Sequence, residues 1–291
     1  MRSEADRSLI DRMCVSPNPF RQSGGSTFSL PSADLFSGVP VALDSAGFVA
    51  HHCYGGFPWS VKEYIRLAAS YPWDWYASMD LCCEPEIASN REEVRRRQQE
   101  TIRLLGACRE EANRQGIAPP MPVLQGWRAT DYLRFAEAMT DLPSLVGLGS
   151  VCRRSLSGPS GLLSIIERLD RSLPRGVRLH LFGVKGTAIQ KLAGHPRIHS
   201  VDSMAWDFQA RKAAALHQHS NTLEHHIHIM RRWYTRQIET LPQQAGGKDT
   251  AKDVGGAFRQ RLCRDRRKAQ GQRQINLWMN ETNLDWLDGQ R

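Results

Sequence analysis

Six short apolar runs, separated by stretches of helical character, constrain the fold of this chain more than any other feature. The runs cover residues 39–47, 76–83, 121–127, 144–151, 177–186 and 198–206. Apolar runs of this length are typical of strands that are buried on both faces. The intervening helical segments cover residues 60–70, 89–115, 129–141 and 158–173. Strands that alternate with helices of this length predict βαβ units around a parallel sheet.

A polar residue or a glycine lies at or near the C-terminal end of every apolar run. These residues are Asp44, Asp80, Gln125, Gly149, Lys185 and Asp202. In a (β/α)8 barrel the strand ends converge on one face, where the βα loops build the active site. A doubly wound sheet binds its ligand at a switch point, often beside a glycine-rich fingerprint. The sequence contains neither GxGxxG nor a P-loop. We therefore predict an α/β fold of the TIM-type (β/α)8 barrel class. Two of its strands would have to come from the N-terminal region and from the chain after residue 206.

The pattern changes after residue 241. Residues 242–256 are rich in glycine, glutamine and charge, which predicts a linker. Residues 257–274 hold seven Lys and Arg against one Asp, a run typical of a solvated helix face, a disordered tail or a nucleic-acid contact. We therefore expect a barrel over 1–241, a linker over 242–256 and a basic, helical C-terminal extension over 257–291.

The overall charge favours a polyanionic partner. The net charge is +9 and the pI is near 9.4, which makes nucleic acid the simplest partner. The sequence has no apolar run long enough for a transmembrane helix and no signal peptide, so we expect a cytoplasmic protein without a membrane partner. Its seven cysteines include no CxxC, which predicts buried reduced thiols instead of a disulfide framework or a thiolate zinc site.

Asp202 is placed unusually, inside the apolar segment 198–206. An ionised carboxylate in such surroundings is costly unless it is paired or used. A strand-end Asp often caps the following helix, but Asp202 is followed by an apolar stretch instead of a polar helix start. An Asp can act as a nucleophile at a sugar carbon, and a second carboxyl group can move protons to a leaving group. A third, with a Gln and backbone N–H groups, can recognise the edge of a guanine-like base.

Six motifs together resemble the tRNA-guanine transglycosylase superfamily, most closely the DpdA family of DNA 7-deazaguanine-inserting transglycosylases. In chain order they are LDSAGF, SMDLCCEPE, VLQGW, GLGSVCRR, HLFGVKG and SVDSMAWD, and the resemblance covers roughly residues 14 to 206. It implies a (β/α)8 barrel and a pentosyltransferase that exchanges guanine in DNA for a 7-deazaguanine base, with 7-cyano-7-deazaguanine as the expected substrate. It also implies DNA as partner, together with helper proteins of a DNA-modification system.

The resemblance assigns roles by position. Asp202 matches the nucleophile that attacks C1′ of the target guanosine and holds a covalent sugar–enzyme intermediate. Asp44 matches the second catalytic Asp, which handles protons and the incoming base. Asp80 matches the Asp that hydrogen-bonds the guanine edge. Base recognition is completed by a Gln and by glycine backbone, which match Gln125, Gly126, Gly147 and Gly149.

Two basic groups are candidate DNA contacts. Arg153 and Arg154 follow the strand end in GLGSVCRR, where a phosphate contact is one expectation and a helix cap or surface ion pair is the alternative. In the basic tail the candidates are Arg264, Arg266, Arg267 and Lys268.

The sequence departs from the superfamily pattern at the metal. The superfamily carries a structural zinc site, built from cysteines and a histidine, after the nucleophile strand, and the corresponding cysteines are missing. Residues 217–233 instead hold five histidines. A metal could be coordinated by His217, His219, His225 and His228, although such clusters are more often solvent-facing helix residues. The structural zinc therefore stays open, and the exchange chemistry itself needs no cofactor.

Three other functions compete with DNA base exchange. A tRNA-guanine transglycosylase would use the same chemistry, but SVCRR and DSMAW, and the lack of a recognisable RNA-binding module, favour DNA. A non-catalytic, nucleic-acid-binding barrel subunit would be expected to lack the nucleophile, yet Asp202, Asp44 and Asp80 are all present. An unrelated glycosidase with paired carboxylates would be expected to carry a strand-end Glu pair.

Overall fold

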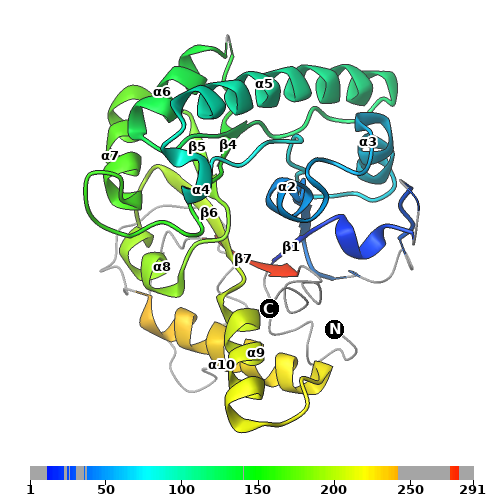
Figure 1. Ribbon diagram of the computed structural model, residues 1–291, viewed down its shortest axis with the longest axis vertical. Coiled ribbons are helices and arrows are strands. Elements are labelled where there is room, and N and C mark those ends of the chain that lie inside the picture. Colours follow the sequence, from blue (N-terminus) through cyan, green and yellow to red (C-terminus); the bar gives the residue numbers. More distant parts are fainter. Residues whose placement is uncertain are drawn as a thin grey trace.

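The computed structural model describes residues 12–22, 25, 27–30, 36, 38–139 and 141–241, together with the backbone of residues 276–281. Within this part of the chain, helices surround a central group of strands (Figure 1). The strands are β1 (Met13–Val15), β2 (Val41–Leu43), β3 (Val123–Leu124), β4 (Leu145–Leu148), β5 (Arg178–Leu181), β6 (Ile198–Ser203) and β7 (Asn276–Glu281). They form one sheet in the order β2-β1-β7-β6-β5-β4-β3, and every pairing is parallel. The predicted α/β class with a parallel sheet is confirmed.

The helices alternate with the strands, as the sequence predicts. They are η1 (Asn18–Phe20), α2 (Gly47–Tyr54), α3 (Val61–Ala69), α4 (Pro85–Ala88), α5 (Arg91–Arg114), α6 (Ala129–Glu137), α7 (Leu162–Ser172), α8 (Gly186–Leu192), α9 (Ala205–His217) and α10 (Leu223–Thr240). The helical segments 60–70, 89–115, 129–141 and 158–173 correspond to α3, α5, α6 and α7. At the start of α3 the Ser60 hydroxyl accepts a bond from the Glu63 N–H and the Glu63 carboxylate accepts one from the Ser60 N–H, which forms a capping box.

One predicted strand is reduced to two bridging residues. Within the run 76–83, Tyr76 bridges Leu43 of β2, and Ala77 bridges Met121 just before β3, both in parallel. The segment 76–77 therefore joins the two edges of the seven-stranded sheet.

The C-terminal expectation needs a correction. Residues 276–281, which the sequence analysis assigns to the basic tail, form β7 between β6 and β1, with Ser203 opposite Met279 and Met279 opposite Met13. Two strands indeed come from the N-terminal region and from the chain after residue 206, because β1 and β7 supply them. The linker 242–256 and the remainder of the tail lie outside the described residues.

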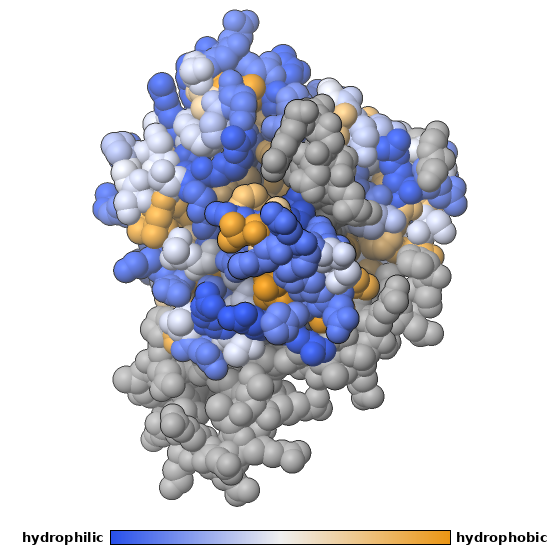
Figure 2. Space-filling model, turned by 60° about the horizontal axis from the view of Figure 1, so that its bottom comes forward, coloured by the Kyte–Doolittle hydropathy of each residue, from blue (hydrophilic) through white to orange (hydrophobic). Residues whose placement is uncertain are grey.

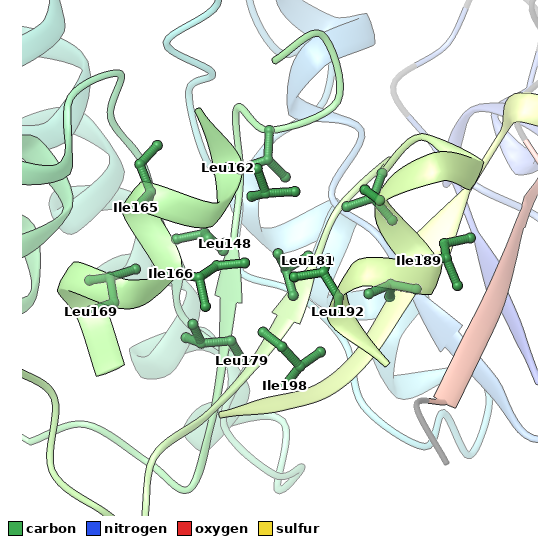
Figure 3. Close-up of a cluster of buried hydrophobic side chains, with 14 of the residues drawn as sticks. Leu148, Leu162, Ile165, Ile166, Leu169, Leu179, Leu181, Ile189, Leu192 and Ile198 are labelled. Atoms are coloured by element: carbon green, nitrogen blue, oxygen red, sulfur yellow. The ribbon is translucent and has the colours of Figure 1, made fainter. Parts of the chain in front are cut away.

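The core is built from the inner faces of the helices and both faces of the strands. The largest cluster packs α7 and α8 against β4, β5 and β6, with Leu148, Leu162, Ile165, Ile166, Leu169, Leu179, Leu181, Ile189, Leu192 and Ile198 at its centre (Figure 3). Full burial of each such Leu or Ile contributes about 1.5–3 kcal/mol. A second cluster joins β1 and β2 to α2, α3 and α5. Two packed halves therefore hold the strand ends in fixed positions.

The described surface is mainly polar. In the view of Figure 2 the hydrophobic patches are small and lie among hydrophilic side chains. The large hydrophobic side chains that are exposed within the described residues are Tyr54, Phe208, Leu216 and Leu223. No helix in this part of the chain has the length and apolar character needed to cross a membrane.

Candidate active site

The carboxyl ends of the parallel strands bring three aspartates together. Asp44 directly follows β2, Asp80 follows the bridging segment 76–77, and Asp202 lies near the end of β6. The pKa of Asp44 is raised to about 7. Burial is the main cause, and the negative charges of Asp80 and Asp202 contribute as well. The strands that precede Asp44 and Asp202 are parallel members of one sheet, and the segment 76–77 before Asp80 bridges β2 in parallel, so the three aspartates lie at the same edge of the sheet.

Asp202 is fully buried and is held on two sides. Its Oδ1 accepts a hydrogen bond of 2.9 Å from the Gly183 N–H and lies 3.3 Å from His180 Nε2. Its backbone carbonyl accepts a bond of 2.9 Å from the Val184 N–H. The carboxylate is thus aimed by the neighbouring strand β5 and the turn that follows it.

His180 is a site residue that sequence reasoning missed. It is fully buried on β5, its Nδ1 lies 2.7 Å from Ser200 Oγ, and its ring packs against Trp75 and Phe182 at centroid distances of 4.6 Å each. Burial lowers the pKa of His180, although Asp202 opposes that shift. A neutral imidazole that donates from Nε2 to Asp202 and accepts at Nδ1 from the Ser200 hydroxyl fits both contacts. A histidine inside an apolar strand run was the available sequence signal.

Asp80 belongs to a buried network of polar side chains. Its carboxylate accepts hydrogen bonds from the Ser45 hydroxyl and from Gln125 Nε2. Gln125 Oε1 accepts a bond of 2.5 Å from the Ser150 hydroxyl, and Ser150 Oγ accepts one of 2.6 Å from the Cys83 N–H. Burial raises the pKa of Asp80 to about 6, while the bonds from Ser45 and Gln125 act to lower it. The network fixes the orientation of the Gln125 amide, since its oxygen and its nitrogen have different partners.

The predicted glycines have steric roles that differ from one another. A Cβ on Gly149 would lie 2.1 Å from Gln125 Nε2, so only a glycine leaves room for that amide. A Cβ on Gly126 would meet Asp131 Cβ at 2.6 Å, and one on Gly147 would meet Phe182 Cε2 at 2.7 Å. Gly149 therefore contacts the network of Asp80, Gln125 and Ser150 directly, whereas Gly126 and Gly147 allow close packing.

The backbone of Gly149 is already engaged. Its N–H donates to the Leu124 carbonyl over 3.0 Å, and its carbonyl accepts a bond of 2.9 Å from the Tyr132 hydroxyl. The Gly147 N–H similarly donates to the Pro122 carbonyl over 2.8 Å. The sheet therefore uses the N–H groups of Gly147 and Gly149 in this structure, and base recognition by the glycine backbone stays a prediction.

Two further residues of LDSAGF also shape the site, and the sequence analysis missed both. Ser45 is fully buried, donates to Asp80 and accepts the Gly47 N–H over 3.2 Å. A Cβ on Gly47 would lie 2.3 Å from the Asp80 carbonyl oxygen. The N-terminus of α2 therefore approaches Asp80 closely because position 47 has no side chain.

Glu84 and Cys152 extend the site toward Gly183. Glu84 is 3% exposed, and its Oε1 accepts a bond of 3.5 Å from the Cys152 thiol. Burial raises the pKa of Glu84. A Cβ on Gly183 would lie 2.8 Å from Cys152 Cβ, and the Gly183 N–H binds Asp202. A further buried carboxyl group is thus linked to the candidate nucleophile through Cys152 and Gly183.

The two predicted phosphate ligands after β4 behave differently. Arg154 is 3% exposed, its guanidinium lies 4.0 Å from the centre of the Trp127 ring, and it donates to the Trp127 and Ser160 carbonyls over 2.7 and 2.6 Å. Arg154 is therefore buried among the loops in this structure, and its phosphate contact stays a prediction. The Arg153 side chain is 45% exposed and forms an ion pair with Glu86, which is the surface pairing considered above.

We expect Arg154→Ala to lower the free energy of unfolding by about 2 kcal/mol or more, because it removes a buried guanidinium that packs on the Trp127 ring and donates to the Trp127 and Ser160 carbonyls. The matched variant Arg153→Ala should change it by less than about 1 kcal/mol, since exposed ion pairs contribute little. Urea denaturation followed by circular dichroism measures both values. Equal destabilisation by the two variants would show that the buried guanidinium does not hold the loops together.

The histidine-rich segment shows contacts between rings but no metal site. The rings of His219 and His225 lie 4.4 Å apart, and His225 Nε2 lies 2.8 Å from the Ala210 carbonyl. His217 and His228 are exposed. Within the described residues, no three His, Cys, Asp or Glu side chains are arranged to hold a metal ion. The tail candidates Arg264, Arg266, Arg267 and Lys268 lie outside the described residues.

Comparison with known protein families gives one finding that bears on this site. The family model described as "DpdA: DeoxyPurine in DNA protein A" matches residues 27–272. The matched range contains all three aspartates of the site, together with Gln125 and Gly149. No curated protein matches the chain.

Proposed function

The chain belongs to the DpdA family of DNA deazapurine-inserting transglycosylases, and from this premise we propose that it exchanges guanine in DNA for 7-cyano-7-deazaguanine through a covalent Asp202–deoxyribose intermediate. The observation that carries the proposal is the buried Asp202 carboxylate, aimed by Gly183 and His180 beside Asp44. A nucleophile that is weakly hydrated and rigidly held suits attack at a sugar carbon.

We propose further that the sheet closes into a (β/α)8 barrel in which the segment 76–77 is the eighth strand. The bridges Leu43–Tyr76 and Ala77–Met121 support this closure, because they link the two edge strands of the sheet. In such a barrel the strand ends that carry Asp44, Asp80 and Asp202 would surround one pocket.

The proposed reaction proceeds in two displacements. In the first, Asp202 attacks C1′ of a deoxyguanosine, the C1′–N9 bond breaks, and the departing guanine takes a proton from Asp44. In the second, the incoming 7-deazaguanine gives a proton to Asp44 and its nitrogen forms the new bond to C1′, which releases Asp202. Asp80 accepts from the guanine edge while Gln125 keeps it in place. The target base leaves the helical stack to reach the site.

The raised pKa of Asp44 predicts the pH dependence of the first displacement. Its pKa of about 7 leaves a substantial protonated fraction at neutral pH. If the protonated form is the acid, single-turnover release of guanine falls about tenfold per pH unit above pH 7. Asp44→Asn keeps the size but supplies no proton, so its rate should fall by about 10²–10⁴-fold and lose this pH dependence. A wild-type rate that stays level from pH 6 to pH 9 would refute the acid role.

Nucleoside mass spectrometry tests the function in cells. Plasmid DNA is prepared with and without this gene in a strain that makes 7-cyano-7-deazaguanine, with any helper proteins of the modification system supplied together. We expect a deazapurine deoxynucleoside only when the gene is present, and none in tRNA beyond the background of the strain. Modified tRNA with unmodified DNA would favour the tRNA transglycosylase instead.

A further inference from the structure

A hollow of about 570 Å³ lies between α6 and α7, which run side by side (Figure 1). Its rim is formed by two loops, one between β3 and α6 and the other between β4 and α7. The first loop carries Gln125 and the second begins with Gly149. The hollow therefore adjoins the loops of the base-recognition network.

The hollow is positively charged. Its charged lining residues are Arg128, Arg168, Arg171 and Glu167. Arg171 forms an ion pair with Glu167, whereas in the described part of the chain no ion pair is found for the exposed Arg128 and Arg168. The lining thus carries a net charge of +2, because Glu167 is paired with Arg171 while Arg128 and Arg168 are not paired with it.

Hydroxyl groups complete the lining. Thr130 and Ser160 border the hollow, and so does Ser164, whose hydroxyl donates to the Gly158 carbonyl over 2.7 Å. Arginine and hydroxyl side chains are the donors with which proteins hold the phosphate oxygens of nucleic acids. A second hollow, of about 590 Å³, has Asp74 as the charged residue in its described lining and therefore does not suit an anion.

The rim of the hollow is fixed relative to the recognition network. Arg154 donates to the carbonyl of Trp127, the residue before Arg128, and to the carbonyl of Ser160 on the opposite loop. Gln98 Nε2 donates to the Gln125 carbonyl over 2.6 Å and so anchors the start of the same β3–α6 loop. A phosphate held here would consequently lie at a constant distance from the base held at Asp80 and Gln125.

We propose that this hollow, defined by Arg128 and Arg168, binds a backbone phosphate of the DNA strand whose guanine enters the candidate active site. The proposal rests on the proposed function for the identity of the polyanion. It replaces Arg154 as the phosphate ligand near β4, because the buried Arg154 supports the loops that form the hollow.

The test is a salt titration of DNA binding by fluorescence anisotropy, with the full chain and a guanine-containing duplex. For the double variant Arg128→Ala/Arg168→Ala we expect the slope of log K against log salt to shrink by about 0.9 for each phosphate that is no longer neutralised. Arg128→Lys/Arg168→Lys keeps the charges and should retain most of the slope. The matched control is Arg175→Ala, an exposed arginine in the loop before β5, at the opposite end of the sheet.

The outcomes separate the phosphate site from the proposed reaction. An unchanged slope in the folded double Ala variant would overturn the proposal, and so would an equal decrease of the slope in Arg175→Ala. The proposal would also be overturned if the double Ala variant lost binding to tRNA but kept its binding to DNA. In exchange assays the KM for DNA should rise about tenfold with an unchanged KM for the free base. The binding experiment contains no free base, so it does not depend on the exchange reaction. If the variants change the slope as expected but the wild type exchanges no guanine, the proposed function is refuted and the phosphate site is retained.

Discussion

Replacing Asp202 with alanine is expected to abolish guanine exchange while the protein stays folded. The carboxylate is the nucleophile of the proposed reaction, so its removal should lower the single-turnover rate by at least about 10⁴-fold. The fold should persist because the contacts of the Asp202 carboxylate with the Gly183 N–H and with His180 join neighbouring strands and leave the packed core unchanged. Release of labelled guanine from DNA measures the rate, and thermal unfolding by circular dichroism checks the fold.

A matched variant separates nucleophilicity from shape. Asp202→Asn keeps the size of the side chain and an oxygen that can accept the Gly183 N–H, but it has no charge with which to attack C1′. We expect it to be as inactive as Asp202→Ala. Exchange by Asp202→Asn at a rate near that of the wild type would rule out a covalent role and would reduce Asp202 to a structural residue.

Replacing Gly149 with alanine is expected to impair exchange strongly by displacing the Gln125 amide. The new methyl group would lie 2.1 Å from Gln125 Nε2, so the amide must leave its position between Asp80 and Ser150. The loss of two buried hydrogen bonds costs about 2–4 kcal/mol, which corresponds to about 30- to 1,000-fold in kcat/KM for the base. Steady-state exchange at varied base concentration measures this loss.

The control for Gly149→Ala is Gly106→Ala, in helix α5. No atom lies within 4 Å of a Cβ at position 106, and alanine favours a helix, so exchange should be unchanged. The double variant Gly149→Ala/Gln125→Ala removes the clash and should recover stability but not activity, since Asp80 then lacks its amide partner. Full activity in Gly149→Ala would show that the position of the Gln125 amide does not govern base recognition.

The sequence predicted the strand-end aspartates for a local reason. An Asp near the C-terminal end of an apolar run marks where a buried strand ends and its loop begins, so Asp44, Asp80 and Asp202 could be placed without knowing any contact. The sheet then brings them together, because parallel strands present their carboxyl ends on one side. The same reasoning placed Gln125, since it follows β3 directly.

Residues whose role depends on distant partners could not be predicted. Arg153 and Arg154 are adjacent and chemically identical, yet one pairs with Glu86 at the surface while the other is buried beside Trp127. Only the path of the loop after β4 decides between them. His180 likewise depends on the register that places β5 beside β6, with His180 opposite Ser200.

A strand after residue 206 was expected, but β7 was not located because its signal is not local. Residues 276–281 follow a basic run and contain the polar residues Asn276, Asn280 and Glu281, so the segment does not have the apolar character of the six recognised runs. Its pairing with β6 and β1 joins positions more than seventy residues apart in the chain. The apolar run 76–83 shows the opposite case, in which a strong local pattern forms two bridges instead of a regular strand.

Trapping the covalent intermediate tests the central claim most directly. Wild-type protein and Asp202→Asn are incubated with guanine-containing DNA and with guanine deaminase, which removes the released base and prevents its return. After nuclease digestion, mass spectrometry locates any deoxyribose attached to the protein. The account predicts a deoxyribose adduct on Asp202 in the wild type and none in Asp202→Asn. An adduct on another residue, or guanine release without any adduct, would contradict it.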